Sequence, residues 1–325
     1  MASYVLKRVA VSVALLILSS ILIFCLMRVI PGDPTITKVA ASGTSRGASE
    51  RTLRAVRHEL GLDRSLPSQY FHWIGGVTHG DFGKSYFSQF PVRKLISQQI
   101  GATLELAIIA LLLGVLIAVP AATIGAIWRN RFFDGAVSGF TAVGMSTPAF
   151  VSGILLIVVF GVKLKLLPTQ GYVSIEHHPV ESVKTAILPA ITLGIAVAAP
   201  LLRILNASLR EVASAPYIRT AAGKGLLRRQ VVLRHLLPNA TLPALTTFGV
   251  IVGSLLGGAV IVEHVFARPG LGTLMVDSVF DRDYAVLQSL VLLAAATFIL
   301  SSLAIDLLYG VIDPRLRVRG SAAAR

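Results

Sequence analysis

The sequence predicts an all-α polytopic membrane protein with six transmembrane helices. Of its 325 residues, 54% are hydrophobic and 14% are charged, and the mean hydropathy is +0.75. Soluble domains carry about 25% charged residues, so this chain has an apolar excess that lipid would cover. A helix needs roughly 20 apolar residues to cross ~30 Å of hydrocarbon. Six uncharged stretches meet that need: Val9–Met27, Leu106–Ile127, Gly135–Val162, Ala186–Leu202, Ala240–Val262 and Tyr284–Ile305.

The first stretch has features of both a signal peptide and a membrane helix. Lys7 and Arg8 precede it, as basic residues precede a cleaved signal core. The run is long for such a core, however, and Arg28 follows it in place of a small-residue cleavage site. We therefore expect a retained helix.

Basic residues gather at the ends of the apolar stretches, as the positive-inside pattern requires. With the N-terminus inside, the cytoplasmic segments contain Lys7 and Arg8, Arg129 and Arg131, six basic residues within 210–234, and Arg315, Arg317 and Arg319. We predict that both termini are cytoplasmic. Membrane orientation also accounts for the net charge of +14, so we predict no nucleic-acid partner.

The segment between the first two stretches is too long for a simple connection. Prolines in Arg28-Val-Ile-Pro-Gly-Asp-Pro34 end the first helix. Ser49–Leu62 has the pattern of a short amphipathic helix that stops at Gly61. Gln69-Tyr-Phe-His-Trp73 is an aromatic cluster suited to the outer membrane interface. We expect this segment to pack as an extracytoplasmic cap and not as a separate domain.

Glycines four residues apart mark two of the stretches. Gly135 and Gly139 lie in the third stretch, and Gly249, Gly253 and Gly257 lie in the fifth. This spacing makes a flat helix face that a second helix can approach closely, so packing is the preferred interpretation. The alternative is that the face lines a path or slides during gating. Pro148 marks a bend in the third stretch.

The sequence contains no catalytic or metal-binding pattern. Gly83-Lys84-Ser85 resembles the end of a phosphate-binding loop, but Thr78 stands where that loop needs glycine. His177 and His178 are adjacent, which favours a solvated loop pair over a metal site. The uncharged stretches argue against a proton relay. We predict a non-catalytic chain, without a cofactor, that takes its energy from another polypeptide.

The basic segment 210–237 is the place to look for that contact. Ser214 and Pro216 have the chemistry of a helix start, and Gly225 has that of a helix end. The side chains between them are small, so a partner could approach the backbone closely. A second short helix would begin near Leu227 and lead to Pro238. The alternative is a solvated elbow at the membrane interface.

The spacing of this segment resembles the cytoplasmic loop of ABC importer permeases, which reads Glu-Ala-Ala, three residues, Gly, nine residues, Ile-x-Leu-Pro. Ala221, Gly225, Leu237 and Pro238 match it, and Arg219, Thr220 and His235 depart from it. The departures resemble the dipeptide/oligopeptide/nickel branch, whose loops read Tyr-x-Arg-Thr-Ala-x-x-Lys-Gly-Leu. Further marks of this branch are Arg28-Val-Ile-Pro-Gly-Asp-Pro34, Gly80-Asp-Phe-Gly-Lys-Ser85, Glu263-His-Val-Phe-x-x-Pro-Gly-Leu-Gly272 and Asp313-Pro-Arg315. The long first external segment is similar to that of the B-type permease subunit.

The resemblance implies a type I importer permease fold with a cytoplasmic coupling helix, in a bacterial cytoplasmic membrane. The expected partners are a second related permease, two ATPase subunits that bind ATP and Mg, and an extracytoplasmic substrate-binding lipoprotein. Implied domain bounds are a helix in 1–30, an external segment in 31–99, a permease core in 100–312 and a cytoplasmic tail in 313–325. Within the core, helices are expected at about 102–128, 134–162, 186–208, 238–262 and 284–308, with the coupling loop at 210–237.

The resemblance also implies roles for particular residues. Expected ATPase contacts are Tyr217, Arg219, Thr220, Ala221, Ala222, Lys224, Gly225 and Leu226. Expected residues of the substrate path are Ser146, Pro148, Gly249, Gly253 and Gly257. Expected contacts with the binding protein are Asp33, Asp81, Pro269, Asp281 and Asp283.

Peptides are the expected cargo because they are common in this branch. Nickel, glutathione and other small solutes remain alternatives, because the loop reports the motor and not the cargo. A self-contained secondary transporter is the alternative of a different class. That class predicts inverted repeats and buried charges, which the sequence does not display.

Overall fold

The computed structural model describes residues 2–29, 34–41, 50–128, 130–173 and 178–312. In these ranges the chain is helical and contains no β-strand beyond an isolated bridge between Lys84 and Pro91. The predicted all-α class is confirmed. The elements are α1 (Ala2–Val29), α2 (Pro34–Ala41), α3 (Glu50–Glu59), α4 (Leu66–Thr78), α5 (Val92–Trp128), α6 (Arg131–Ser146), α7 (Ala149–Leu156), the π-helical turn η1 (Ile157–Lys163), α8 (Pro179–Ala213), α9 (Pro216–Gly223), α10 (Arg228–Val231), the π-helical turn η2 (Val232–Leu236), α11 (Leu237–Val265), α12 (Leu271–Phe280) and α13 (Tyr284–Ile312).

Five helices in the described ranges are long and apolar enough to cross a membrane, and the number is six if the bent pair of α6 and α7–η1 counts as one span. The third predicted stretch is interrupted more sharply than the bend that we expected at Pro148. Helix α6 ends at Ser146, and α7 continues with η1 at an angle of 108° to it. Pro148 has no N–H to donate, and its ring pushes Thr147 out of the helical region, to φ −91° and ψ 120°. The proline therefore breaks the helix.

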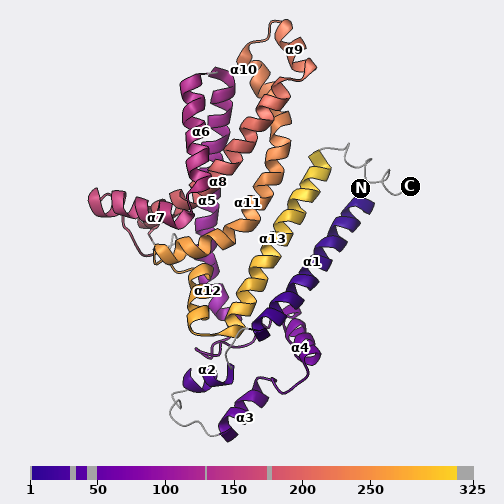
Figure 1. The fold of residues 1–325 in the computed structure, drawn as a ribbon, viewed down its shortest axis with the longest axis vertical. Coiled ribbons are helices and arrows are strands. Elements are labelled where there is room, and N and C mark those ends of the chain that lie inside the picture. Colours follow the sequence, from indigo (N-terminus) through magenta and orange to yellow (C-terminus); the bar gives the residue numbers. More distant parts are fainter. Residues whose placement is uncertain (1, 30–33, 42–49, 129, 174–177, 313–325) are drawn as a thin grey trace.

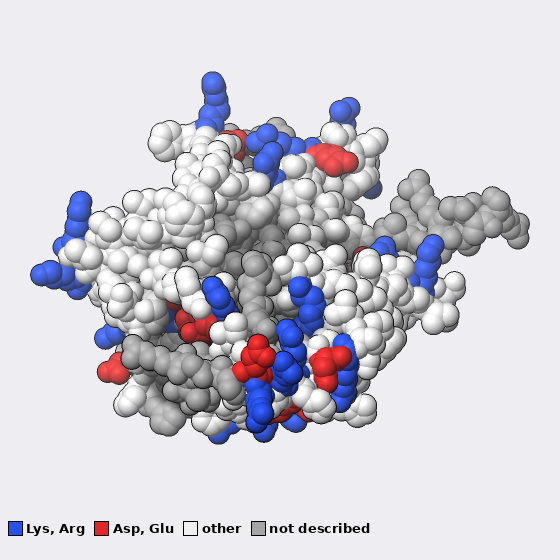
Figure 2. Space-filling model, turned by 60° about the horizontal axis from the view of Figure 1, so that its bottom comes forward, with Lys and Arg blue, Asp and Glu red and all other residues white. Residues whose placement is uncertain are grey.

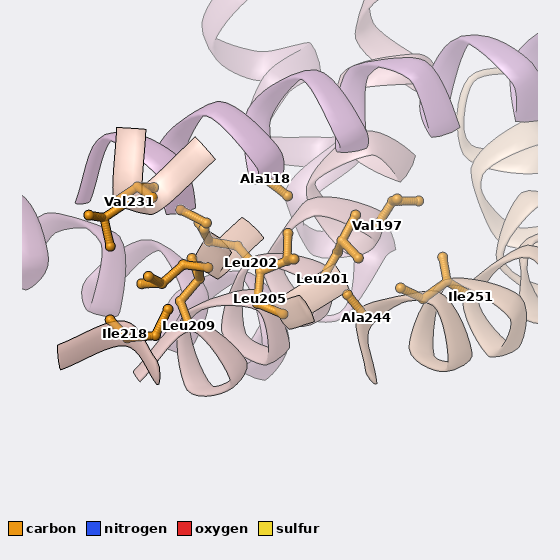
Figure 3. Packing of buried hydrophobic residues seen from close by; sticks show 14 of the residues in the cluster. Ala118, Val197, Leu201, Leu202, Leu205, Leu209, Ile218, Val231, Ala244 and Ile251 are labelled. Carbon is orange, nitrogen blue, oxygen red and sulfur yellow. The ribbon is translucent and has the colours of Figure 1, made fainter. Parts of the chain in front are cut away.

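Helix α8 lies at the centre of the bundle and packs against α5, α6, α7 and α11. Small residues allow this close approach. A Cβ at Gly194 would lie 3.3 Å from Leu113 Cβ of α5, and a Cβ at Gly114 would overlap Val197 of α8. Leu201, Leu202 and Leu205 continue the contact in a buried cluster that includes Ala244 and Ile251 of α11 (Figure 3).

Helices α1 and α13 run side by side along one flank of the bundle (Figure 1). Arg8 Nη1 of α1 lies 2.7 Å from Asp306 Oδ2 of α13, and the Tyr4 hydroxyl donates to the Asp306 carbonyl oxygen at 2.9 Å. Gly249 and Gly253 of α11 face α13 from the other side, where a Cβ would lie 2.5 Å from Ile305 Cγ1 and 2.7 Å from Phe298 Cδ2, respectively. These contacts support packing for two of the three glycines.

The two ends of the molecule differ. Helices α9 and α10 project at one end, and α2, α3 and α4 lie at the opposite end (Figure 1). There, Phe24 of α1 packs on Tyr70 and Trp73 of α4, with ring centroids 5.6 and 6.0 Å apart. Lys, Arg, Asp and Glu side chains gather around this end (Figure 2). The predicted aromatic cluster thus helps to attach the external segment to the first membrane helix.

The α11–α13 contact predicts different effects for two glycines on α11. Gly253→Ala should lower the thermal stability of the purified protein by several degrees, because its Cβ would also lie 3.2 Å from the Phe298 Cα and overpacking costs about 1–3 kcal/mol. Gly257→Ala is the matched control, because no atom lies within 4 Å of its Cβ position. Thermal unfolding in detergent measures both variants, and equal midpoints would contradict the packing assignment.

Candidate functional site

Two apolar side chains attach α9 to the bundle. Ile218 and Ala221 lie one turn apart and are 7% and 9% exposed. They belong to the same buried cluster as Leu209 of α8 and Val231 of α10 (Figure 3). Burial of an isoleucine-sized side chain stabilises a fold by about 1.5–3 kcal/mol. The segment is therefore joined to the bundle core, unlike a fully solvated elbow.

The other face of α9 and the turn after it are open. The exposed residues include seven of the predicted ATPase contacts: Tyr217, Arg219, Thr220, Ala222, Lys224, Gly225 and Leu226. Ala221 is the exception and requires a correction, because it packs inward on its own chain. Leu227 was not among the predicted ATPase contacts, yet its side chain is 71% exposed. Single exposed leucines are common on protein surfaces, so Leu227 extends the open face without by itself marking a partner site.

Helix α9 ends as the glycine pattern predicts, but it begins one residue later than expected. Gly225 adopts φ +80°, in the left-handed region that glycine favours. Ala215, and not Ser214, occupies the N-cap position. Ser214 instead closes α8, where its hydroxyl donates to the Glu211 carbonyl oxygen at 2.7 Å.

Arg228 ties the segment to the end of α5. Its Nε and Nη2 donate to the Ala126 carbonyl oxygen at 3.1 and 2.7 Å. The last carbonyls of a helix lack partners within the helix and carry partial negative charge, so an arginine is well placed there. This contact fixes the start of α10 relative to the α5–α6 turn.

A buried polar network joins α5, α11 and α12 at the opposite end of the bundle. Thr103 Oγ1 donates to Glu263 Oε1 at 2.6 Å and accepts from the Leu271 N–H at 2.8 Å. Glu263 Oε2 accepts from the Gly272 N–H at 2.7 Å. Gly270 has no room for a Cβ, which would overlap the Glu263 carboxylate. The backbone at the end of the motif Glu263–Gly272 therefore packs closely around the carboxylate of its first residue, Glu263.

A second charge is buried beside that network. Arg268 is 1% exposed; its Nη2 lies 3.3 Å from Glu105 Oε1, and its Cζ lies 4.6 Å from the Tyr172 ring centroid. Ser182 of α8 donates to the same Glu105 oxygen at 3.0 Å. Sequence reasoning missed Glu105 and Arg268. Their positions in the sequence could have indicated them, because Glu105 directly precedes an uncharged stretch and Arg268 lies inside the motif Glu263–Gly272.

The predicted binding-protein contacts fall into different environments. Asp283 requires a correction: it is 3% exposed, accepts from the Ser85 hydroxyl and from the Tyr86 N–H at 3.1 Å, and precedes α13. It therefore holds the external segment to α13 and is not open to a partner. Asp81 is exposed, Pro269 is half-buried, and Asp33 lies outside the described residues.

Asp281 is also half-buried and lies just after α12. Burial, with smaller contributions from the carboxylates of Asp277 and Asp283, raises the pKa of Asp281. Negative charge is thus concentrated at the end of α12.

The predicted path residues do not form one surface. Gly249 and Gly253 are covered by α13, as described above, whereas Gly257 has no atom within 4 Å of its Cβ position. Ser146 and Pro148 lie at the bend between α6 and α7, where both are exposed. Gly249 and Gly253 are therefore assigned to the contact between α11 and α13 and not to the substrate path.

The projecting loop and the buried motif Glu263–Gly272 both lie in a region that matches a known family. Residues 110–318 match the family described as "Binding-protein-dependent transport system inner membrane component", and residues 1–107 match its N-terminal membrane component. The chain belongs to this family. It is therefore a multi-pass inner membrane component of a transport system.

Two curated relatives match along the whole chain. The probable peptide ABC transporter permease protein y4tP of Sinorhizobium fredii is 39% identical, over 98% of this chain and 100% of its own. The glutathione transport system permease protein GsiC of Escherichia coli K12 is 41% identical with the same coverage. These matches confirm the predicted branch.

Among solved structures, the inward-facing MetNI methionine ABC transporter has a similar fold. Its matching chain gives a TM-score of 0.56 at 18% identity, covering 67% of this chain and 96% of the other. This likeness confirms the predicted type I importer permease fold.

The Arg228 contact predicts a difference between two adjacent arginines. Arg228→Ala should loosen the α9–α10 segment, because the α5 carbonyl loses a charge-assisted hydrogen bond of about 1.5–3 kcal/mol. Limited proteolysis at Arg219 and Lys224 should then become severalfold faster. Arg229→Ala, which changes an exposed neighbour, is the control and should leave the rate unchanged. Equal proteolysis rates for both variants would contradict the attachment of α10 to α5 through Arg228.

Proposed function

We propose that this chain is a permease subunit of an ATP-driven importer, and that α9 is its coupling helix. The observation that carries the proposal is the two-sided character of α9. Ile218 and Ala221 are buried in the bundle, whereas Tyr217, Lys224 and Leu226 are exposed at its projecting end. A short helix of this kind can receive a push from a partner and pass it to α8 and α11.

The partner that fits this face is an ATPase subunit with a groove for a small, basic helix. Two such ATPases would bind ATP and Mg, while the permease itself would hold no cofactor and catalyse no reaction. Closure of the ATPases on ATP would shift α9, and the permease would alternate between two states. A partner biases such an equilibrium only through contacts that differ between the states.

The remaining partners follow from the family description, which names a binding-protein-dependent system. A second related permease would complete the membrane path, and an extracytoplasmic lipoprotein would deliver cargo to the α2–α4 end. Both termini of this chain would be cytoplasmic, on the same side as α9. Peptides are the cargo that we favour, supported by the name of the Sinorhizobium relative. Glutathione, named for the Escherichia coli relative, is the alternative.

A substitution at the end of α9 tests the coupling role. Gly225→Ala forces an L-residue into φ +80°, which costs about 1–2 kcal/mol and should lower the population of the docked loop at least fivefold. ATP-driven peptide uptake by the reconstituted complex should fall by a similar factor. Gly223→Ala, in the last turn of α9, is the control, because nothing lies within 4 Å of its Cβ position. Full uptake by the Gly225 variant, with unchanged uptake per ATP, would refute the coupling role.

The energy source can be tested with the separate subunit. The purified chain should bind no ATP and hydrolyse none, and hydrolysis should appear when the two ATPases are added. Equilibrium binding of a labelled nucleotide measures the first outcome. Stoichiometric binding to the permease alone would overturn the assignment of ATP to its partners.

A further inference from the structure

A polar groove runs between α6 and α8, and its lining includes one of the predicted path residues, Ser146. It has a volume of about 520 Å³, and its lining includes Ser138, Thr141, Ser146, Arg203, Asn206 and Arg210. A neighbouring cavity of about 420 Å³ shares Ser138, Asn206 and Arg210 and reaches Asp134 and Arg228. Because they share these lining residues, the two spaces adjoin each other and extend toward the α9 end.

Arg203 lies deep in the apolar zone. Its Nη1 is 3.7 Å from Met145 Sδ, at the far end of α6 from the charged turn at Arg131. Helix α6 has 16 residues and is therefore ~24 Å long, so the guanidinium lies roughly 20 Å from that turn. The hydrocarbon of a bilayer is ~30 Å thick. With the charged turn at one edge of that layer, the guanidinium falls inside the apolar zone and not at its edge.

Arg203 has no carboxylate partner in the described part of the chain, and neither has Arg210. The contact of Arg203 with Met145 is weak, because a thioether sulfur is a poor hydrogen-bond acceptor. Both arginines are exposed in the single chain. An exposed arginine at this depth is unfavourable against lipid and marks a pathway or a water-filled cavity.

The arrangement favours a pathway over a fixed ion pair with the second permease. A fixed pair needs one charge, whereas here polar residues recur along α8 at Arg203, Asn206 and Arg210. They recur on α6 at Ser138, Thr141 and Ser146. Residues three or four apart share one helix face, so Arg203, Asn206 and Arg210 form one polar strip on α8, and Ser138 and Thr141 share a face of α6.

We propose that this groove is the α9-side half of the cargo path, and that Arg203 holds the carboxylate of a passing anionic solute such as a peptide. The proposal rests on the importer function above. Arginine suits the task because its planar guanidinium matches a carboxylate with two hydrogen bonds. Arg210 continues the basic line toward the exit.

Thiol labelling of the complete transporter tests the groove without any cargo. Cys25 is the single cysteine of this chain, so a Cys25→Ser background removes it. In that background, the Asn206→Cys variant should react with a negatively charged methanethiosulfonate faster than with a positively charged one of similar size. Adding Arg203→Gln should lower this preference about fivefold, the size of a charge–charge interaction across ~8 Å of partly hydrated protein.

Two controls define the labelling result. Lys184→Gln removes a charge from the other end of α8 and should not alter the preference. Leu116→Cys, at a 66% exposed apolar position of α5, should react with neither reagent because lipid covers it. Labelling is followed by the mass of this chain. An unreactive Asn206→Cys variant, or a preference that Arg203→Gln leaves unchanged, overturns the proposal.

Uptake by the reconstituted complex tests the cargo chemistry. Trialanine and its C-terminal amide serve as probes, each with its affinity for the binding protein measured separately. Arg203→Gln should lower uptake of the acid at least fivefold and change uptake of the amide less than twofold. Equal loss of both, in an assembled complex, would assign Arg203 to an ion pair with the second permease and overturn the proposal. If the unmutated complex imports neither probe with ATP, the importer function fails, while the labelling result still decides the groove.

Discussion

The close approach of α5 and α11 to α8 is the constraint on which the rest of the structure depends. Lipid is as apolar as the helices, so membrane helices associate through tight packing and not through exclusion of water. Gly114 and Gly194 supply that packing between α5 and α8. The leucines of α8 at positions 201, 202 and 205 extend it to the α9 end.

Because α8 is central, it takes part in the organisation of both ends of the molecule. Near its start, Ser182 donates to Glu105, which lies beside the buried Arg268. At its other end, Leu209 packs with Ile218 of α9. A force on α9 therefore acts on a helix that also contacts the external network. Desolvation offsets much of the attraction between Arg268 and Glu105, so this buried pair adds little net stability.

The sequence predicted the helical class, the five crossings that are single helices and the end of α9 just before Gly225. These features follow from local chemistry: uncharged runs, prolines and a glycine that tolerates positive φ. The sequence was less reliable where a residue's role depends on what lies across from it. Asp283 looked like an open acidic contact, but it accepts from Ser85 and Tyr86, which are distant in sequence. Ala221 matched a motif, yet it faces inward.

By itself, the sequence determined the membrane class, the basic projecting loop and the family, since each depends on residue type and spacing along the chain. Tertiary structure decided which side of each helix meets another helix. It covered Gly249 and Gly253 with α13 and left Arg203 exposed opposite Met145. Hydropathy averages over a helix and does not report its rotation, whereas packing selects one rotation. That choice separates a packing glycine from a path residue, and a lipid-facing surface from a polar groove.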